Sequence, residues 1–151
     1  MNPDFDDLLQ SLMDTGASFL IVGAHAMAVH GVPRATGDLD IWVEATEDNA
    51  ARVIRALANF GAPIDSLGIT AADLVKADVV IQIGLPPRRI DFLTGLSGLA
   101  FAEAWPRRVW YDFGGRTLPF LDRESLVRNK RATGRVKDLA DLEAMGEATD
   151  K

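Results

Sequence analysis

The segment DLDIWV at residues 38–43 constrains the fold most, because it combines the apolar pattern of a strand with two acidic residues. Side chains two residues apart on a strand point to the same side of the sheet. Asp38 and Asp40 therefore face one spot, where two carboxylates lie close enough to repel each other. We expect a positively charged group to lie between them.

Length and composition predict a single cytoplasmic domain over residues 1–151. The chain is long enough for a proper core, and its 48% apolar and 25% charged residues are ordinary for a globular protein. No stretch approaches the roughly 18 to 20 consecutive apolar residues of a membrane span. The acidic residues 1–7 lack the basic start of a signal peptide. The absence of cysteine excludes disulfides and fits a reducing compartment. We expect no contact with a membrane.

The charges are unevenly distributed along the chain. The net charge of −6 argues against general coating of nucleic acid. Residues 1–50 contain nine acids and one base, whereas residues 88–137 contain eleven bases and five acids. This division suits a cleft between metal-binding carboxylates and a phosphate-binding wall. A chance scatter of solvated charges explains it equally well.

Hydrophobic periodicity predicts an alternation of helices and strands. We expect helices at about residues 5–13, 24–29, 46–58, 71–76, 123–133 and 136–145. We expect strands at about residues 18–22, 38–43, 79–83, 89–93, 109–113 and 116–120. Gly114 and Gly115 indicate a hairpin between the last two strands, so the sheet should be mixed rather than parallel. The fold class is α/β or α+β, with a helical pair at about residues 122–146.

Two further features extend the acidic strand into a candidate site. Gly23 and Ala24 follow a strand and open a helix, where backbone N–H groups can meet phosphate oxygens, although most such junctions are only turns. Asp91 lies within a later apolar strand and points away from its neighbours Ile90 and Phe92. An isolated charge in the core would be costly. If Asp91 lines the same cleft as the first two acids, three carboxylates can hold one or two Mg²⁺ ions.

These motifs together resemble the polymerase-β-like nucleotidyltransferase superfamily. They are Val22-Gly23-Ala24, Asp38-Leu39-Asp40 and Ile90-Asp91-Phe92. The longer stretches VGAHAMAVHGVPRATGDLDIWV and LVRNKRATGRVKDLADLEAM are similar to the stand-alone bacterial branch, which includes the nucleotidyltransferase toxins of abortive-infection systems. The resemblance covers about residues 20–145. It implies a minimal nucleotidyltransferase palm, in which a mixed sheet carries the acids and helices pack on its outer face.

The resemblance also implies an enzymatic reaction. Asp38 and Asp40 would bind Mg²⁺ or Mn²⁺, and Asp91 would activate the attacking hydroxyl while touching one ion. The reaction would move an NMP from an NTP to a hydroxyl of RNA, a protein or a small molecule. Ala24 departs from the family's Gly or Ser and lacks a hydroxyl for the triphosphate. The plain alternative is that Asp38 is a turn residue and Asp40 an exposed edge residue.

Other candidate nucleotide-binding residues flank these motifs. Arg34 and Thr36 precede the acidic strand, where Arg34 could neutralise a phosphate or form only a structural salt bridge. Lys130, Lys137 and Asp138 match the functional lysine and acid of the similar toxins. A solvated helical face with local ion pairs explains them equally well. We expect Lys130 to be exposed and to contact the nucleotide as a point charge.

A second class of function stays open. The chain could be a non-catalytic nucleotide-binding protein, or one half of a toxin–antitoxin pair that binds a cognate toxin or antitoxin. Ala24 favours this hypothesis, whereas three mutually repelling acids argue against it. A nucleotide sensor is a third, weaker hypothesis.

Overall fold

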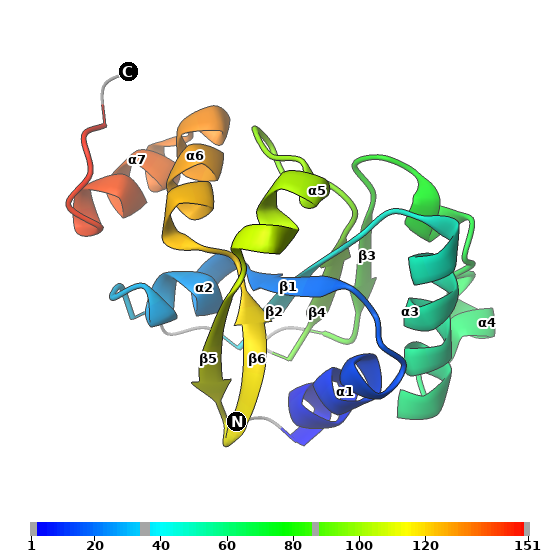
Figure 1. The fold of residues 1–151 in the computed structure, drawn as a ribbon. Helices are drawn as coiled ribbons and strands as arrows, with labels where there is room; N and C mark the ends of the chain where they lie inside the picture. The colour runs from blue at the N-terminus through cyan, green and yellow to red at the C-terminus, as the bar shows by residue number, and fades with distance from the viewer. Residues whose placement is uncertain (1–2, 34–36, 86–87, 150–151) are drawn as a thin grey trace.

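The computed structural model describes residues 3–33, 37–85 and 88–149. Seven α-helices, two 3₁₀ helices and six strands alternate along this part of the chain (Figure 1). The α-helices are α1 (Pro3–Asp14), α2 (Gly23–Val29), α3 (Glu47–Phe60), α4 (Ile64–Leu67), α5 (Phe101–Ala104), α6 (Arg123–Thr133) and α7 (Val136–Ala144). The strands are β1 (Phe19–Val22), β2 (Leu39–Val43), β3 (Val80–Ile83), β4 (Ile90–Leu93), β5 (Val109–Phe113) and β6 (Arg116–Phe120). The 3₁₀ helices are η1 (Asp73–Val75) and η2 (Trp105–Arg107).

The six strands form one mixed sheet in the order β3-β4-β2-β1-β6-β5. The central pair β1 and β2 is antiparallel, and β2 pairs in parallel with β4. On the other side, β1 pairs in parallel with β6. Hairpin partners β3 and β5 close the two edges as antiparallel strands. The predicted α/β class with a mixed sheet is therefore confirmed.

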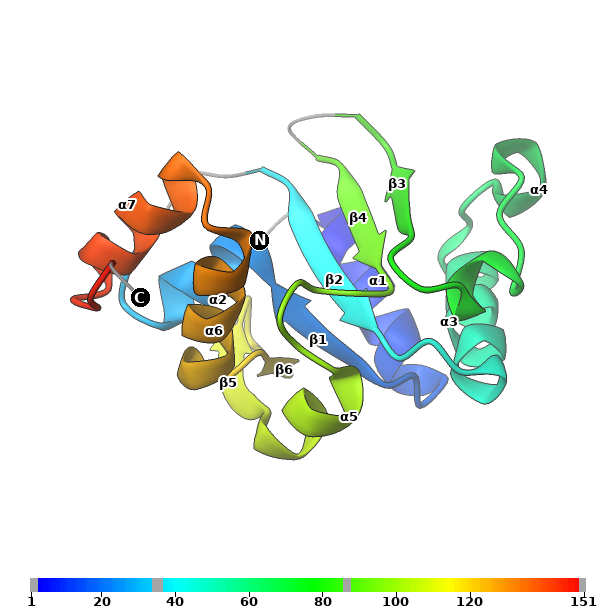
Figure 2. The ribbon, with the colours of Figure 1, turned by 90° about the horizontal axis from the view of Figure 1, so that it is seen from above.

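The buried faces of the helices follow the spacing of their apolar residues. Helix α1 buries Phe5, Leu8, Leu9 and Leu12, which share one face of the helix. It packs against α3, whose start is capped because the Thr46 hydroxyl accepts a hydrogen bond from the Asn49 N–H. Helices α1 and α3 lie on one side of the sheet, whereas α6 and α7 lie at the opposite end of the molecule (Figure 2).

The short helices are where the structure differs from the sequence prediction. Helices α4 and α5 span four residues each, and η2 spans three. None of them has room for the apolar repeat of an amphipathic helix, so periodicity does not detect them. The helix expected at residues 71–76 is reduced to the single turn η1. No helix of the described residues has the length and apolar character needed to cross a membrane.

Candidate functional site

Strand register brings the three predicted acids to one place. Asp40 on β2 lies opposite Asp91 on the parallel neighbour β4. On its other side Asp40 lies opposite Val22, the last residue of β1, so Gly23 follows beside it. Asp38 immediately precedes β2. Leu39 and Ile41 on β2 and Ile90 and Phe92 on β4 are buried in the core. The alternation of side chains turns Asp40 and Asp91 to the opposite face of the sheet.

A cavity of about 360 Å³ opens over these acids. Its lining contains seven of the ten predicted site residues: Gly23, Ala24, Asp38, Asp40, Asp91, Lys130 and Lys137. Asp40 and Asp91 come from β2 and β4, Asp38 immediately precedes β2, and the two lysines come from α6 and α7. Acidic and basic segments that are far apart in the sequence thus face each other across one cavity.

Arg89 supplies the positive group between the acids. Its Nε donates to Asp91 Oδ1 at 2.8 Å, and its Nη2 donates to Asp91 Oδ2 at 3.2 Å. The same Nη2 lies 3.7 Å from Asp38 Oδ2, and the backbone N–H of Arg89 donates to Asp38 Oδ1 at 3.1 Å. The hydrogen bonds to Asp91 raise the pKa of Arg89. A single guanidinium therefore connects two of the three carboxylates.

Asp40 is the least compensated of the three acids. Burial raises the pKa of Asp40 to about 6, and the negative charges of Asp91 and Asp38 add to this effect. The positive charges of Arg89 and Lys137 act in the opposite direction. A second positive charge near Asp40 would relieve this repulsion.

The donor chemistry of the three acids fits a divalent ion, since Mg²⁺ prefers carboxylate oxygens. In residues 3–33, 37–85 and 88–149, however, no three acidic or histidine side chains are placed to hold a metal ion together. In this arrangement the guanidinium of Arg89 is bound to Asp91 and contacts Asp38. Asp38, Asp40 and Asp91 are the residues that would hold a metal.

Gly23 allows the first turn of α2 to lie against Asp40. Its φ of +69° lies in the left-handed region, and a Cβ at this position would overlap the Asp40 carboxylate. Gly31 also has a positive φ, +99°, but a Cβ there would meet nothing within 4 Å. A side chain at either glycine would strain the backbone, but only a side chain at Gly23 would also clash with Asp40.

We expect Gly23→Ala to lower the transfer activity proposed below by about a hundredfold, because it displaces Asp40 from its place beside Asp91. It should also cost about 1 to 2 kcal/mol of unfolding free energy from the left-handed backbone. Gly31→Ala is the matched control, with a similar loss of stability and near wild-type activity. Turnover assays and thermal melts of both variants measure the difference. Equal activity of the two variants would contradict a special role for Gly23.

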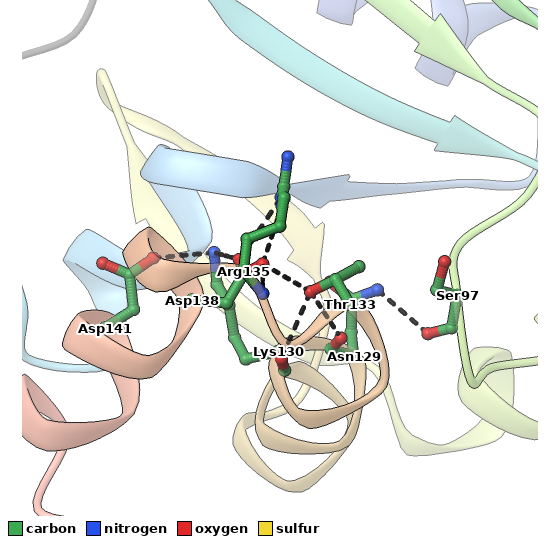
Figure 3. A network of polar contacts seen from close by, with 7 residues as sticks. All are labelled: Ser97, Asn129, Lys130, Thr133, Arg135, Asp138 and Asp141. Atoms are coloured by element: carbon green, nitrogen blue, oxygen red, sulfur yellow. Dashed lines mark hydrogen bonds and ion pairs between the residues drawn. The ribbon is translucent and has the colours of Figure 1, made fainter. Parts of the chain in front are cut away.

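The basic residues from α6, α7 and the junction between them that line the cavity are Lys130, Arg135 and Lys137. The position of Lys130 differs from the sequence expectation. Lys130 is 8% exposed, so the expectation of an exposed lysine is wrong. Its Nζ lies 2.8 Å from Asp141 Oδ2 and 3.5 Å from Asp138 Oδ1, and both acids are buried (Figure 3). Burial lowers the pKa of Lys130, although the charge of Asp138 acts in the opposite direction. Lys130 reaches the cavity with its charge already paired.

Asp138 connects α6 to α7 and does not line the cavity. It accepts hydrogen bonds from Thr133 Oγ1 at 2.7 Å, from Arg135 Nε at 2.7 Å and from the Arg135 backbone N–H at 3.1 Å. Burial alone would raise the pKa of Asp138, but the hydrogen bonds from Arg135 and Thr133 outweigh burial and lower it. Its observed contacts are those of a helix-junction residue.

Two predicted residues, Arg34 and Thr36, lie outside the described residues. The sequence prediction also missed four polar residues that line the cavity: Arg89, Asn129, Arg135 and Asp141. Arg89 had a detectable signal, because it lies two residues before Asp91 on the same strand pattern and therefore on the same face.

No protein-family model and no curated protein matches the sequence. Among solved structures, the chain is similar to a protein of Thermotoga maritima that is provisionally described as a nucleotidyltransferase. The TM-score is 0.58 at 15% sequence identity, over 95% of this chain and 92% of the other. The likeness is one of fold. It supports the predicted nucleotidyltransferase-like architecture across nearly the whole chain.

Proposed function

We propose that the protein is a metal-dependent nucleotidyltransferase that moves an NMP from an NTP to a hydroxyl group and releases pyrophosphate. The observation that carries the proposal is the shared cavity, in which Asp38, Asp40 and Asp91 face Lys137 and the paired Lys130. Its volume of about 360 Å³ lies within the range of small-molecule sites, about 300 to 1,000 Å³. The fold of the Thermotoga maritima protein agrees with this function.

Each part of the cavity has a role in the proposed reaction. Asp38, Asp40 and Asp91 would hold Mg²⁺ or Mn²⁺, which would supply charge stabilisation at the transferred phosphoryl group. Asp91 would accept the proton of the attacking hydroxyl. Lys137 is exposed at the cavity and would bind the phosphates as a point charge. Arg89 would release Asp91 when the carboxylates take up a metal.

The direct test is incubation with each α-labelled NTP, Mg²⁺ or Mn²⁺, total RNA and lysate protein. We expect label to appear in one acceptor class in a metal-dependent manner, with RNA or a protein as the proposed acceptor. A chelator should abolish the transfer, because the carboxylates would lose the charge that aligns them with the phosphates. Absence of transfer to RNA, protein and small molecules with every NTP and both metals would contradict the proposal.

The pairing of Arg89 with two of the acids favours a second candidate function, a non-catalytic nucleotide-binding protein. In that case Arg89 would remain the resident counter-charge. The likeness of the two quoted motifs to abortive-infection toxins extends either proposal to a cognate toxin or antitoxin partner. Nucleotide binding without label transfer would support this candidate.

A further inference from the structure

Part of the cavity lining is aliphatic. Met27, Leu121 and Leu126 are at most 1% exposed, so this surface belongs to the packed core and is formed before any ligand arrives. The apolar lining residues are Val22, Met27, Leu93, Leu96, Leu121 and Leu126. Leu93 and Leu96 are partly exposed above this packed base, and a flat apolar group can cover them without losing hydrogen bonds.

Asn129 on α6 is the uncharged polar side chain in the lining of this cavity. Its Nδ2 donates a hydrogen bond to the backbone carbonyl of Ser97 at 3.0 Å (Figure 3). A carbonyl oxygen only accepts, so this contact fixes which end of the amide is nitrogen. Among the described residues the amide forms no other hydrogen bond. Oδ1 therefore remains as an acceptor, and the second N–H remains as a donor.

The loop that holds Asn129 is itself tightly packed on α6. Gly98 has a φ of +78°, and a Cβ at this position would lie 2.7 Å from the Cβ of Ala132. Leu96 and Leu99 form an isolated bridge within the same loop. The Asn129 amide is thus held in one orientation by a fixed wall, which is what a selective hydrogen-bonding group requires.

We propose that the aliphatic part of the cavity lining binds the base of the donor nucleotide and that Asn129 selects a base whose Watson–Crick edge has an amino group beside a ring nitrogen acceptor. This inference rests on the proposed function. On this edge adenine and cytosine each present an amino N–H beside a ring nitrogen acceptor, which matches the Oδ1 and remaining N–H of Asn129. Guanine presents its amino group there beside a ring N–H, which opposes the N–H of Asn129 with a second donor. Hypoxanthine and uracil present a carbonyl oxygen at that position, which opposes Oδ1 with a second acceptor. ATP and CTP are therefore the favoured donors.

The sharpest test compares nucleotides that differ mainly at this one group. Calorimetry with the full chain, Mg²⁺ and no acceptor should show ATP binding about tenfold or more tightly than ITP, or CTP more tightly than UTP by the same factor. The pair in which the nucleotide with the amino group binds more tightly identifies the preferred base. Asn129→Ala should reduce the preference to less than about threefold. Ser97→Ala is the matched control and should retain it, because the contact uses the Ser97 backbone carbonyl.

The possible outcomes separate this inference from the proposed function. Binding of all four nucleotides with equal affinity would overturn the selection by Asn129 while leaving nucleotide binding intact. A preference for ITP and UTP would overturn it as well, as would an amino preference that Asn129→Ala leaves unchanged in a folded protein. Absence of binding by any nucleotide would instead overturn the proposed function. Thermal melts establish that both variants fold.

Discussion

Asp40→Asn should lower NMP transfer by about a thousandfold or more, while the metal-free protein should be at least as stable as the wild type. The substitution keeps the shape of the side chain and removes one of three mutually repelling charges. It also removes a carboxylate that would hold the metal and stabilise charge at the transferred phosphoryl group. Turnover with labelled NTP and thermal melts in a chelator measure the two effects.

The pH dependence of stability gives an independent readout of Asp40. Its pKa is about 6 in the folded protein, above the unfolded value of 3.8, so the folded state retains a proton that the unfolded chain releases. The unfolding free energy should therefore fall as pH rises between about 4 and 6, by about 1 to 2 kcal/mol after screening by solvent. Asp40→Asn should remove this slope in denaturant titrations.

Added metal should separate the variant from the wild type. A ligand that binds only the native state at a hundredfold excess over its Kd adds about 2.7 kcal/mol of stability. We expect this gain in the wild type with Mg²⁺ or Mn²⁺, and a much smaller one in Asp40→Asn. Asp112→Asn, at an exposed acid on the edge strand β5, is the control and should behave as the wild type. Full metal stabilisation and turnover in Asp40→Asn would exclude the proposed site.

Lys130→Met should destabilise the protein by about 3 to 5 kcal/mol, which is the usual cost of removing one partner from a buried ion pair. The side chains of Asp138 and Asp141 are 1% and 3% exposed, so neither can turn to water when the ammonium is lost. Denaturant titration at neutral pH measures the loss. Asp141→Asn in the same chain should restore part of it, because it removes the buried negative charge.

Lys137→Met is the matched control for Lys130→Met. Both lysines line the cavity, but Lys137 is exposed. Its substitution should leave the melting temperature unchanged and weaken NTP binding by about five- to tenfold, since it removes a phosphate contact. Wild-type stability of Lys130→Met would contradict the structural role of the buried pair. Wild-type NTP affinity of Lys137→Met would remove Lys137 from the phosphate site.

The strand pattern allowed most of the sheet and the acidic half of the site to be predicted from the sequence. The strands at residues 109–113 and 116–120 have the expected bounds, because their limits are marked by Gly114 and Gly115. That Asp38 and Asp40 share one face followed from the alternation of side chains along a strand, whereas the convergence of Asp91 with them was expected from the resemblance of the three motifs. Arg89 shares a face with Asp91 by the same alternation, but the sequence prediction applied this rule only to the acids and so missed Arg89.

The basic half of the site was predicted less well, because charge was taken as a sign of exposure. Lys130 follows Leu126 and Val127 by four and three residues, which places it on the buried side of α6. Asp138 and Asp141 share the buried side of α7 with Leu142 in the same way. Burial of these charges becomes possible only when the two helices pack together, and neither helix alone indicates that arrangement.

Asp40 and Asp91 lie opposite each other on β2 and β4, and the packing of the apolar core holds them in this alignment. A slip of one residue between these strands would turn Asp91 inward and expose Ile90 and Phe92, so burial of the apolar side chains holds the register against the repulsion. The carboxylates cannot drift apart to relax. The free energy of burying these apolar side chains thus offsets the repulsion between the two carboxylates, and a metal bound as proposed would be favoured by relieving that repulsion.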